Sequence, residues 1–377
     1  MKIGIIGSGA MGSGIAQVAA MAGWEVYLYD INPESVTKAL QHISESINKF
    51  VSKQKMTAEQ GVAAFGRIYA CSQLETLAES DLIIEAIIEN LDKKKSLFQT
   101  LEKIVQDTCI IASNTSSYSI TALASSLQKP ERFTGIHFFN PPALMKLVEI
   151  IPATQSTADF ALKVQKIIES WGKIPLIARD TPGFIVNKVA RPFYSEALRI
   201  YEEGIATPQQ IDLAMTNHGF KMGPFTLMDF IGHDVNYFVT ESVWKAFYYD
   251  SRYKPSIAQL KLVEAGFLGR KSGRGFYDYN AHIEPLTDLE DNLSGQIFMR
   301  IISMLVNEAA DTVYLNICSK EDVEAAVKLG VNYPKGLLEW GSELGYQNIV
   351  QHLNELYDFY HEERYRVSPY LKKLAKF

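Results

Sequence analysis

The feature that most constrains the fold of this chain is a glycine pattern near its start, Gly7-x-Gly9-x-x-Gly12. Residues 2–7 form a short, continuous apolar run, which is typical of a strand covered on both faces. The glycines permit a tight turn, and the helix that follows offers backbone N–H groups to an anion. A second apolar segment, 25–29, completes a strand–helix–strand unit. This order predicts a dinucleotide-binding fold.

An acidic residue stands where the second strand ends. Asp30 follows the last glycine of the pattern, Gly12, at close to the distance of about 20 residues expected for a residue that binds the adenosine ribose. Its carboxylate would accept hydrogen bonds from the ribose hydroxyls and repel a 2′-phosphate. Glycine-rich turns also occur without any nucleotide, but the complete context indicates that the cofactor is NAD rather than NADP.

Strands and helices alternate over the first half of the chain. Asp92 is the expected N-cap of an amphipathic helix, and the charge run Lys93–Lys95 is expected to form a solvated face of that helix. Glu89 and Ser116 fall just after predicted strands, at the sheet edge where ligands bind. Residues 33–65 are longer than an ordinary crossover and are expected to be a helical excursion. The further strands predicted here are 67–70, 81–88, 109–113 and 174–178.

A proline-rich turn lies between two apolar segments in the middle of the chain. Residues 135–139 and 146–151 are predicted to pair as a hairpin around the turn 140–145. In that pairing His137 and Glu149 face each other. A carboxylate orients a histidine and stabilises its protonated form, which suits a general base near neutral pH. The alternative is that the two side chains merely satisfy each other within a sheet.

The chain of 377 residues is too long for one simple core. Residues 1–180 are predicted to form an α/β domain with a Rossmann-type, doubly wound sheet, followed by an all-α half. Thr181-Pro-Gly183 is expected to cap the first helix of that half, with proline in its first turn. The all-α half is predicted to contain a helical domain over 181–280 and a second, degenerate helical repeat over 285–377.

The prediction of a repeat comes from an internal echo in the sequence. Three short motifs recur at an offset of 112 positions, Glu196-Ala-Leu as Glu308-Ala-Ala, Ile205-Ala-Thr as Ile317-Cys-Ser, and Ile211-Asp212 as Val323-Glu324. Leu227-Met-Asp229 then answers to Leu337-Leu-Glu339 after a small shift. Together these matches indicate a duplicated helical unit.

Composition narrows the class of protein and the compartment. Three scattered cysteines without a C-x-x-C pair argue for a reducing cytosol, and against a disulfide framework or a zinc site. No apolar run approaches the roughly 20 residues that a spanning helix needs, and the first strand leaves no room for a signal peptide. The formal net charge of −6 gives no general attraction to nucleic acid. We therefore expect a cytoplasmic protein without metal, membrane or nucleic-acid partners.

Taken together, five segments resemble the L-3-hydroxyacyl-CoA dehydrogenases, the NAD enzymes of fatty-acid β-oxidation. The segments are Ser113–Ser117, His137–Pro141, Pro182–Asn187, Met222–Phe225 and Gly269–Tyr277. The resemblance covers about residues 1–280, and the tail resembles the second helical unit of longer members. One departure, a second proline at Pro142, is expected to stiffen the turn. The resemblance implies NAD-dependent oxidation of (S)-3-hydroxyacyl-CoA to 3-oxoacyl-CoA.

The resemblance also implies roles for individual residues. His137 matches the catalytic base of the family, and Glu149 matches the carboxylate that orients it. Ser116 and Asn187 match residues that hydrogen-bond the substrate near its reacting oxygens. The positions that match contacts to the CoA moiety are Ser46 and Lys53, and those that match cofactor contacts, beside Gly7, Gly9 and Gly12, are Asp30, Glu89, Lys94, Asn140 and Lys271.

Two other interpretations stay open. The β-hydroxyacid dehydrogenases, which act on free acids, also join a Rossmann domain to a helical one, and use a lysine in a G-x-x-x-N-x-x-K helix. Gly183 and Asn187 fit that pattern, but Ala190 occupies the position of its lysine. The second alternative is a non-enzymatic role, such as the one that lens crystallins of the family have. The sequence does not define the length of the acyl chain.

The second helical repeat bears on self-association. Family members with one helical unit typically dimerise through it, and here an internal copy can cover the same apolar face. At the offset of 112, Met299 corresponds to Asn187, so the second repeat is expected to be structural and to pack on the first. Whether the whole chain also forms a homo-oligomer is left open.

Overall fold

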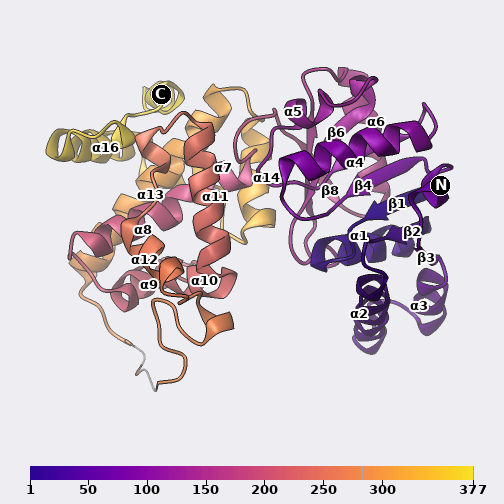
Figure 1. Cartoon of the computed structure of the whole chain (residues 1–377). Coiled ribbons are helices and arrows are strands. Elements are labelled where there is room, and N and C mark those ends of the chain that lie inside the picture. The colour runs from indigo at the N-terminus through magenta and orange to yellow at the C-terminus, as the bar shows by residue number, and fades with distance from the viewer. Residues whose placement is uncertain (282–283, 285, 377) are drawn as a thin grey trace. The chain divides into compact units, whose positions relative to one another are not determined.

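The computed structural model describes residues 1–281, 284 and 286–376, and the chain forms two compact units. The first unit, Met1–Thr181, contains one sheet and the helices that cover it (Figure 1). The second unit, Pro182–Phe377, is helical, with only isolated bridges among its described residues. The predicted fold class, a Rossmann-type sheet followed by an all-α half, is confirmed.

Eight strands form the sheet in the order β3-β2-β1-β4-β5-β6-β7-β8. All neighbours are parallel except β6 and β7, which form the predicted hairpin. β4 is shorter than predicted, because the Glu85 carboxylate accepts from the N–H of Ile87 at 2.7 Å and the chain turns there. The strands are β1 (Lys2–Ile6), β2 (Glu25–Tyr29), β3 (Ile68–Cys71), β4 (Leu82–Glu85), β5 (Ile110–Ser113), β6 (Phe133–Phe138), β7 (Leu147–Pro152) and β8 (Ile174–Ile177).

An apolar core lies on one face of the sheet. Alternate residues of the strands point into it, such as Ile3 and Ile5 of β1 and Ile136 and Phe138 of β6. Helix α1 covers β1 and β2, and α6 covers β7 and β8. The helices of this unit are α1 (Ala10–Met21), α2 (Pro33–Ser52), α3 (Ala58–Phe65), α4 (Leu91–Ile104), α5 (Ile120–Ala124) and α6 (Ala158–Ser170).

The predicted helical excursion over 33–65 consists of α2 and α3. Asn32 caps α2 by accepting from the N–H of Glu34, and Thr57 forms a capping box at the start of α3. The two helices pack against each other and against α1, and they extend away from the sheet in Figure 1. The apolar side chains of α2 and α3 are therefore buried in the same core that α1 and the sheet form.

Two predicted helix starts are wrong. Asn90, not Asp92, caps α4, because the Asn90 side chain accepts from the N–H of Lys93 at 3.0 Å. The first helix of the second unit begins at Val186 rather than at the Thr181-Pro-Gly183 break. Gly183 and Phe184 have φ values of 76° and 49°, so the chain passes through a left-handed turn before it becomes helical.

The second unit contains two copies of one succession of helices. The predicted domain ranges 181–280 and 285–377 stay a prediction, since the two copies form a single compact unit. Among the residues that the structure describes, no helix is both long enough and apolar enough to cross a membrane. In order, α7 (Val186–Val189) and α8 (Arg191–Glu202) correspond to α13 (Asp291–Tyr314), α9 (Pro208–Asn217) to α14 (Lys320–Gly330), α10 (Pro224–Ile231) to α15 (Leu337–Leu344), α11 (His233–Ala246) to α16 (Tyr346–Tyr360), and α12 (Ile257–Glu264) to α17 (Pro369–Leu374).

The offset between the copies is not uniform. It is 112 positions at the starts of α9 and α14, but 113 at Pro224 of α10 and Leu337 of α15. The predicted match of Leu227-Met-Asp229 with Leu337-Leu-Glu339 is therefore wrong. The reason is that α14 has 11 residues where α9 has 10, so one extra residue precedes α15.

Candidate functional site

The glycine pattern forms a compact turn between β1 and α1. The N–H of Gly7 donates to the carbonyl of Tyr29 at 2.9 Å, and Gly7 has a φ of 98°. A Cβ on Gly12 would lie 1.8 Å from the Gly7 carbonyl oxygen, so only glycine fits there, whereas a Cβ on Gly9 would meet nothing within 4 Å. Gly9 is the N-cap of α1 and has no side chain to satisfy the first N–H groups of the helix. This open helix start fits a pyrophosphate.

Asp30 lies directly after β2, beside this turn. Its carboxylate accepts from the N–H and the hydroxyl of Ser8, at 2.8 and 2.9 Å, and from the N–H of Asn32 at 3.0 Å. Burial raises the pKa of Asp30, but these hydrogen bonds outweigh it and the net pKa is below its ordinary value. Asp30 is therefore an oriented carboxylate, as a ribose contact requires.

A cavity of about 1110 Å³ opens between these two features. It is large enough for a cofactor, since ligand pockets commonly measure roughly 300–1,000 Å³. Gly7, Gly9 and Asp30 line it, together with Lys38 and His42 of α2. Gly7 and Gly9, predicted to lie at the pyrophosphate, and Asp30, predicted to bind the ribose, thus line the same cavity. This arrangement fits NAD.

A buried ion-pair network closes the next part of the sheet edge. The ammonium of Lys94 lies 2.6 Å from Oε1 of Glu85 and 3.0 Å from Oε2 of Glu89. Lys94 is 1 % exposed and therefore does not belong to the solvated face predicted for Lys93–Lys95. Lys93 is exposed and Lys95 is half-buried. Burial of this lysine is possible because two carboxylates surround it.

The same carboxylates hold the loop that follows β5. Oε2 of Glu85 accepts from the hydroxyl of Ser113 at 2.6 Å. Oε1 of Glu89 accepts from the hydroxyl of Thr115 at 2.7 Å and from the N–H of Ser116 at 3.2 Å. Glu89 therefore brings Lys94 and Ser116 together. Glu85, which was not among the predicted site residues, links Lys94 to Ser113. Glu85 could have been found as the acidic residue in the middle of a predicted strand that is otherwise apolar around it.

His137 and Glu149 lie opposite each other in the hairpin, as predicted. Nδ1 of His137 is 2.7 Å from Oε2 of Glu149, and the two side chains are 8 % and 0 % exposed. Phe139 packs against the imidazole, with 4.6 Å between the ring centroids. Both rotation and tautomer of the imidazole are thus fixed by a buried carboxylate.

The loop after β5 also contacts the strand that carries His137. Ser113 pairs with Gly135 across the parallel strands β5 and β6. The side chain of Asn114 accepts from the N–H of Phe138 at 2.8 Å. Ser116 and His137 therefore belong to neighbouring strand ends at one edge of the sheet, where ligands bind in doubly wound folds.

The proline-rich turn is held by Lys173, which directly precedes β8. Lys173 donates to the carbonyls of Pro142 and Met145 at 2.6 and 2.8 Å, and burial lowers its pKa to about 8. Asn140, the predicted cofactor contact, is exposed and precedes a cis peptide bond to Pro141. Lys173 was not anticipated, since a lysine next to a strand has no distinctive sequence signal.

The two predicted CoA contacts lie at the far end of α2. Ser46 is half-buried on this helix, and Lys53 is its exposed C-cap residue. The step from one to the other is about two helical turns, so they lie on one side of the helix. Lys53 supplies a positive charge suited to a phosphate group.

The second unit carries the two remaining predicted residues. Asn187 is half-buried on α7, and its carbonyl accepts from Nε of Arg191 at 2.9 Å. Lys271, a predicted cofactor contact, is exposed and lies 2.5 Å from Oδ1 of Asp234. The structure thus shows Lys271 paired with a surface carboxylate. A contact between Lys271 and the cofactor stays a prediction.

Comparison with known proteins identifies the family. The model of the 3-hydroxyacyl-CoA dehydrogenase NAD-binding domain matches residues 2–181. The model of the C-terminal domain of the same enzymes matches residues 183–279 and again 295–377. The chain belongs to the 3-hydroxyacyl-CoA dehydrogenase family.

Relatives agree with this assignment, some of them over nearly the whole chain. A 3-hydroxyadipyl-CoA dehydrogenase of Escherichia coli K12 is 36% identical, over 99% of this chain and 97% of the relative. A probable 3-hydroxybutyryl-CoA dehydrogenase of Deinococcus radiodurans is 43% identical, over 74% of this chain and 100% of the relative. The crystal structure of a 3-hydroxybutyryl-CoA dehydrogenase from Escherichia coli K12 superposes with a TM-score of 0.95, at 36% identity, over 100% of this chain and 98% of that one.

As a member of the 3-hydroxyacyl-CoA dehydrogenase family, the protein is an NAD-dependent oxidoreductase. The match favours this activity over the free-acid and non-enzymatic alternatives. The double match of the C-terminal model agrees with the two copies of the helical succession.

Proposed function

We propose that this protein oxidises (S)-3-hydroxyacyl-CoA to 3-oxoacyl-CoA with His137 as the general base. The observation that carries the proposal is the 2.7 Å contact between Nδ1 of His137 and a fully buried carboxylate of Glu149, at the edge of a nucleotide-binding sheet. A base at this edge stands where the substrate must meet the cofactor in a doubly wound fold. The (S) configuration is taken from the family resemblance.

In the proposed reaction the substrate loses two hydrogens, one as a hydride to the cofactor and one as a proton to the protein. NAD, when bound, accepts a hydride from C3 of the substrate. His137 takes the proton of the 3-hydroxyl group, so the C–O single bond becomes a carbonyl. Because Nδ1 faces Glu149, the proton is exchanged at Nε2. In the reverse direction the imidazolium of His137 returns the proton to the 3-oxygen.

Other residues bind and orient the substrate in this proposal. Glu149 fixes the imidazole and stabilises its charged form. The hydroxyl of Ser116 and the amide of Asn187 hydrogen-bond the substrate near its reacting oxygens. General-base catalysis is typically worth roughly 10²–10⁴ in rate, so positioning must supply much of the remainder.

The CoA part of the substrate is assigned to α2, through Ser46 and Lys53. The acyl group is not assigned, because relatives of this chain carry the names of both 3-hydroxybutyryl-CoA and 3-hydroxyadipyl-CoA dehydrogenases. A kinetic comparison of acetoacetyl-CoA, a longer 3-oxoacyl-CoA and a dicarboxylic 3-oxoacyl-CoA would establish the preference.

The proposal is tested by His137→Gln, assayed with NADH and acetoacetyl-CoA. We expect kcat to fall by roughly 10²–10⁴, because the amide cannot exchange the proton. NADH binding, measured by fluorescence titration, should stay near the wild-type value, since the cavity at Gly9 and Asp30 is unchanged. His352→Gln, in helix α16 of the second unit, is the matched control and should keep full activity. Near-wild-type turnover of His137→Gln would end the assignment.

A further inference from the structure

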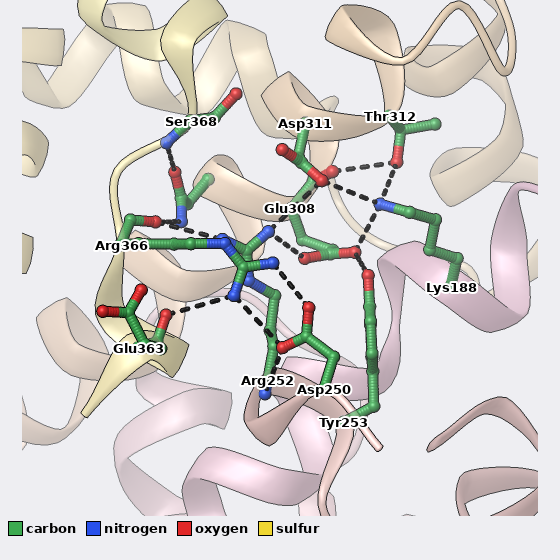
Figure 2. Close-up of polar contacts among 11 residues, drawn as sticks. Lys188, Asp250, Arg252, Tyr253, Glu308, Asp311, Thr312, Glu363, Arg366 and Ser368 are labelled. Atoms are coloured by element: carbon green, nitrogen blue, oxygen red, sulfur yellow. Dashed lines mark hydrogen bonds and ion pairs between the residues drawn. The ribbon is translucent and has the colours of Figure 1, made fainter. Parts of the chain in front are cut away.

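Two buried carboxylates organise the interior of the helical unit. The first is Glu308 on α13, which is fully buried. Figure 2 shows its polar contacts. Its Oε1 lies 2.5 Å from the ammonium of Lys188 and accepts from the hydroxyl of Tyr253, also at 2.5 Å. Its Oε2 accepts from Arg252 at 3.2 Å. Lys188 and its two neighbours in this network come from the first repeat, whereas Glu308 comes from the second.

The second carboxylate, Glu196 on α8, has the reciprocal arrangement. Its Oε1 lies 2.6 Å from Nε of Arg300 and accepts from the hydroxyl of Tyr365 at 2.6 Å. Arg364 donates to the same Tyr365 hydroxyl at 2.7 Å. Here the carboxylate comes from the first repeat and its partners come from the second.

The two networks are copies related by the repeat. Each member has its counterpart 112 positions away, Lys188 with Arg300, Glu196 with Glu308, Arg252 with Arg364, and Tyr253 with Tyr365. The carboxylate of each repeat therefore binds basic and hydroxyl groups of the other repeat, as the equivalent residues of two subunits do across an isologous interface.

One of the two networks is next to a residue of the proposed active site. Lys188 directly follows Asn187 on α7, a helix of four residues. A helix this short has no stability of its own. It contacts α13 and α14 of the second repeat as well as α8. Two more groups of α13 hold the same ammonium, the hydroxyl of Thr312 at 3.1 Å and the carboxylate of Asp311 at 3.5 Å.

Because adjacent helical residues differ in direction by about 100°, fixing Lys188 fixes the direction of its neighbour. Lys188 is 0 % exposed and points into the unit, whereas Asn187 is half-buried. We propose that Glu308 is a positioning residue for Asn187, so that the second repeat, without a substrate contact of its own, sets the geometry of the substrate contact in the first. This inference rests on the proposed role of Asn187.

The charge state of Glu308 is consistent with this anchor. Burial raises the pKa of its carboxyl, but Lys188 and Arg252 outweigh that effect and hold the net pKa below its ordinary value. Glu308 is therefore ionised at neutral pH, and its contact with Lys188 is a charge-assisted hydrogen bond.

The chain itself supplies a matched control for the test. Glu308→Gln and Glu196→Gln each replace a buried carboxylate by an amide of the same shape, in equivalent networks. Both should lower the temperature of thermal unfolding. Only Glu308→Gln should lower kcat with acetoacetyl-CoA, by about tenfold or more, because misplacement of a substrate-positioning group by 1 Å can cost roughly 10² in rate. The KM for NADH should be unchanged. Equal losses of kcat in both variants, or full activity of Glu308→Gln, would overturn the proposal.

A double variant separates positioning from general destabilisation. If Glu308 acts through Asn187, replacing Glu308 should have little further effect once the Asn187 amide is gone. The kcat of Asn187→Ala/Glu308→Gln should then lie within about twofold of that of Asn187→Ala. Independent, multiplying losses would contradict the proposal. An impaired Asn187→Ala beside an unimpaired Glu308→Gln overturns this inference alone. A fully active Asn187→Ala removes the proposed substrate contact, while the His137→Gln assay still decides the general base.

A milder pair of variants serves if either glutamine variant does not fold. Thr312→Val removes one hydrogen bond from Lys188, and Tyr360→Phe removes one from Arg300, at 3.1 Å in each network. Thr312→Val should lower kcat by about two- to fivefold, and Tyr360→Phe should leave it unchanged, as expected for single hydrogen bonds of this size. Equal activity of the two variants would overturn the proposal.

Discussion

The two helical repeats have the same succession of helices but differ at one point. In the first repeat the opening helix is interrupted at Ala190, which separates α7 from α8. In the second repeat the corresponding segment is the unbroken helix α13. Pro192 accounts for the break, since it has no N–H to donate to the carbonyl of Lys188 and its ring crowds that carbonyl. The counterpart of Pro192 in the second repeat is Met304.

The interruption coincides with the proposed substrate contact. Asn187 lies on the short helix that the break creates, whereas its counterpart Met299 lies within a continuous helix. The framework of helices and the buried carboxylates are common to both copies. We infer that the framework can be duplicated without the chemistry, and that the second copy contributes anchoring to the first.

Removal of the second repeat should have the largest effect. Truncation after Asn280 exposes Phe193 and Phe220 of the first repeat, which pack against Tyr333 and Trp340 with centroid distances of 5.7 and 5.2 Å. It also removes the partner of Lys188. We expect aggregation or a new dimer, because a large apolar surface becomes exposed. Light scattering after size-exclusion chromatography measures this, and a monomeric, soluble fragment as stable as the full chain would contradict it.

The Glu308 network should give a pH-dependent loss of stability. At neutral pH we expect Glu308→Gln to cost about 3–5 kcal/mol of unfolding free energy, since Lys188 and Arg252 stay buried and lose their fully buried carboxylate, while the partly exposed Asp311 remains at 3.5 and 3.3 Å. The pKa of Glu308 is below 4.5 in the folded chain, so the advantage of the wild type is complete above pH 4.5 and is lost as the pH falls through the lowered pKa. Urea unfolding of both proteins from pH 7 downward measures it. A difference in unfolding free energy between the two proteins that grows as the pH falls would contradict this prediction.

A proline in the second repeat tests the origin of the break. Met304→Pro places a proline in the middle of α13 and should cost about 3 kcal/mol or more, because this helix, unlike α7 and α8, is continuous. Met304→Leu, which nearly conserves volume, should cost less than about 1.5 kcal/mol. Thermal unfolding compares the two. A well-tolerated proline would show that α13 does not depend on continuity at this position.

Local patterns in the sequence predict much of the site. The hairpin that faces His137 with Glu149 follows from two apolar segments around a proline-rich turn, and the cavity beside Asp30 follows from the glycine pattern. The recurrence of short motifs at one offset indicates the repeat. Each of these features depends on residues near one another or on a periodicity, so one sequence suffices.

Contacts between distant segments could not be predicted in this way. The burial of Lys94 depends on Glu85, and nothing in the run Lys93–Lys95 distinguishes its middle residue from a solvated lysine. The crossed pairing of Glu308 with Lys188 joins residues 120 positions apart. The repeat shows that these two residues have counterparts, but only the packing of α7 on α13 shows that the carboxylates are exchanged between repeats.

The most direct test of the difference between the repeats is a comparison of Asn187→Ala with Met299→Ala. Both substitutions shorten a half-buried side chain at equivalent positions. We expect kcat with acetoacetyl-CoA and NADH to fall by roughly 10²–10³ in Asn187→Ala, the usual cost of losing one hydrogen bond to a reacting oxygen. Met299→Ala should stay within about twofold of the wild type when both are measured well below their unfolding temperatures. Equal losses in the two variants would contradict the proposal that only the first repeat contacts the substrate.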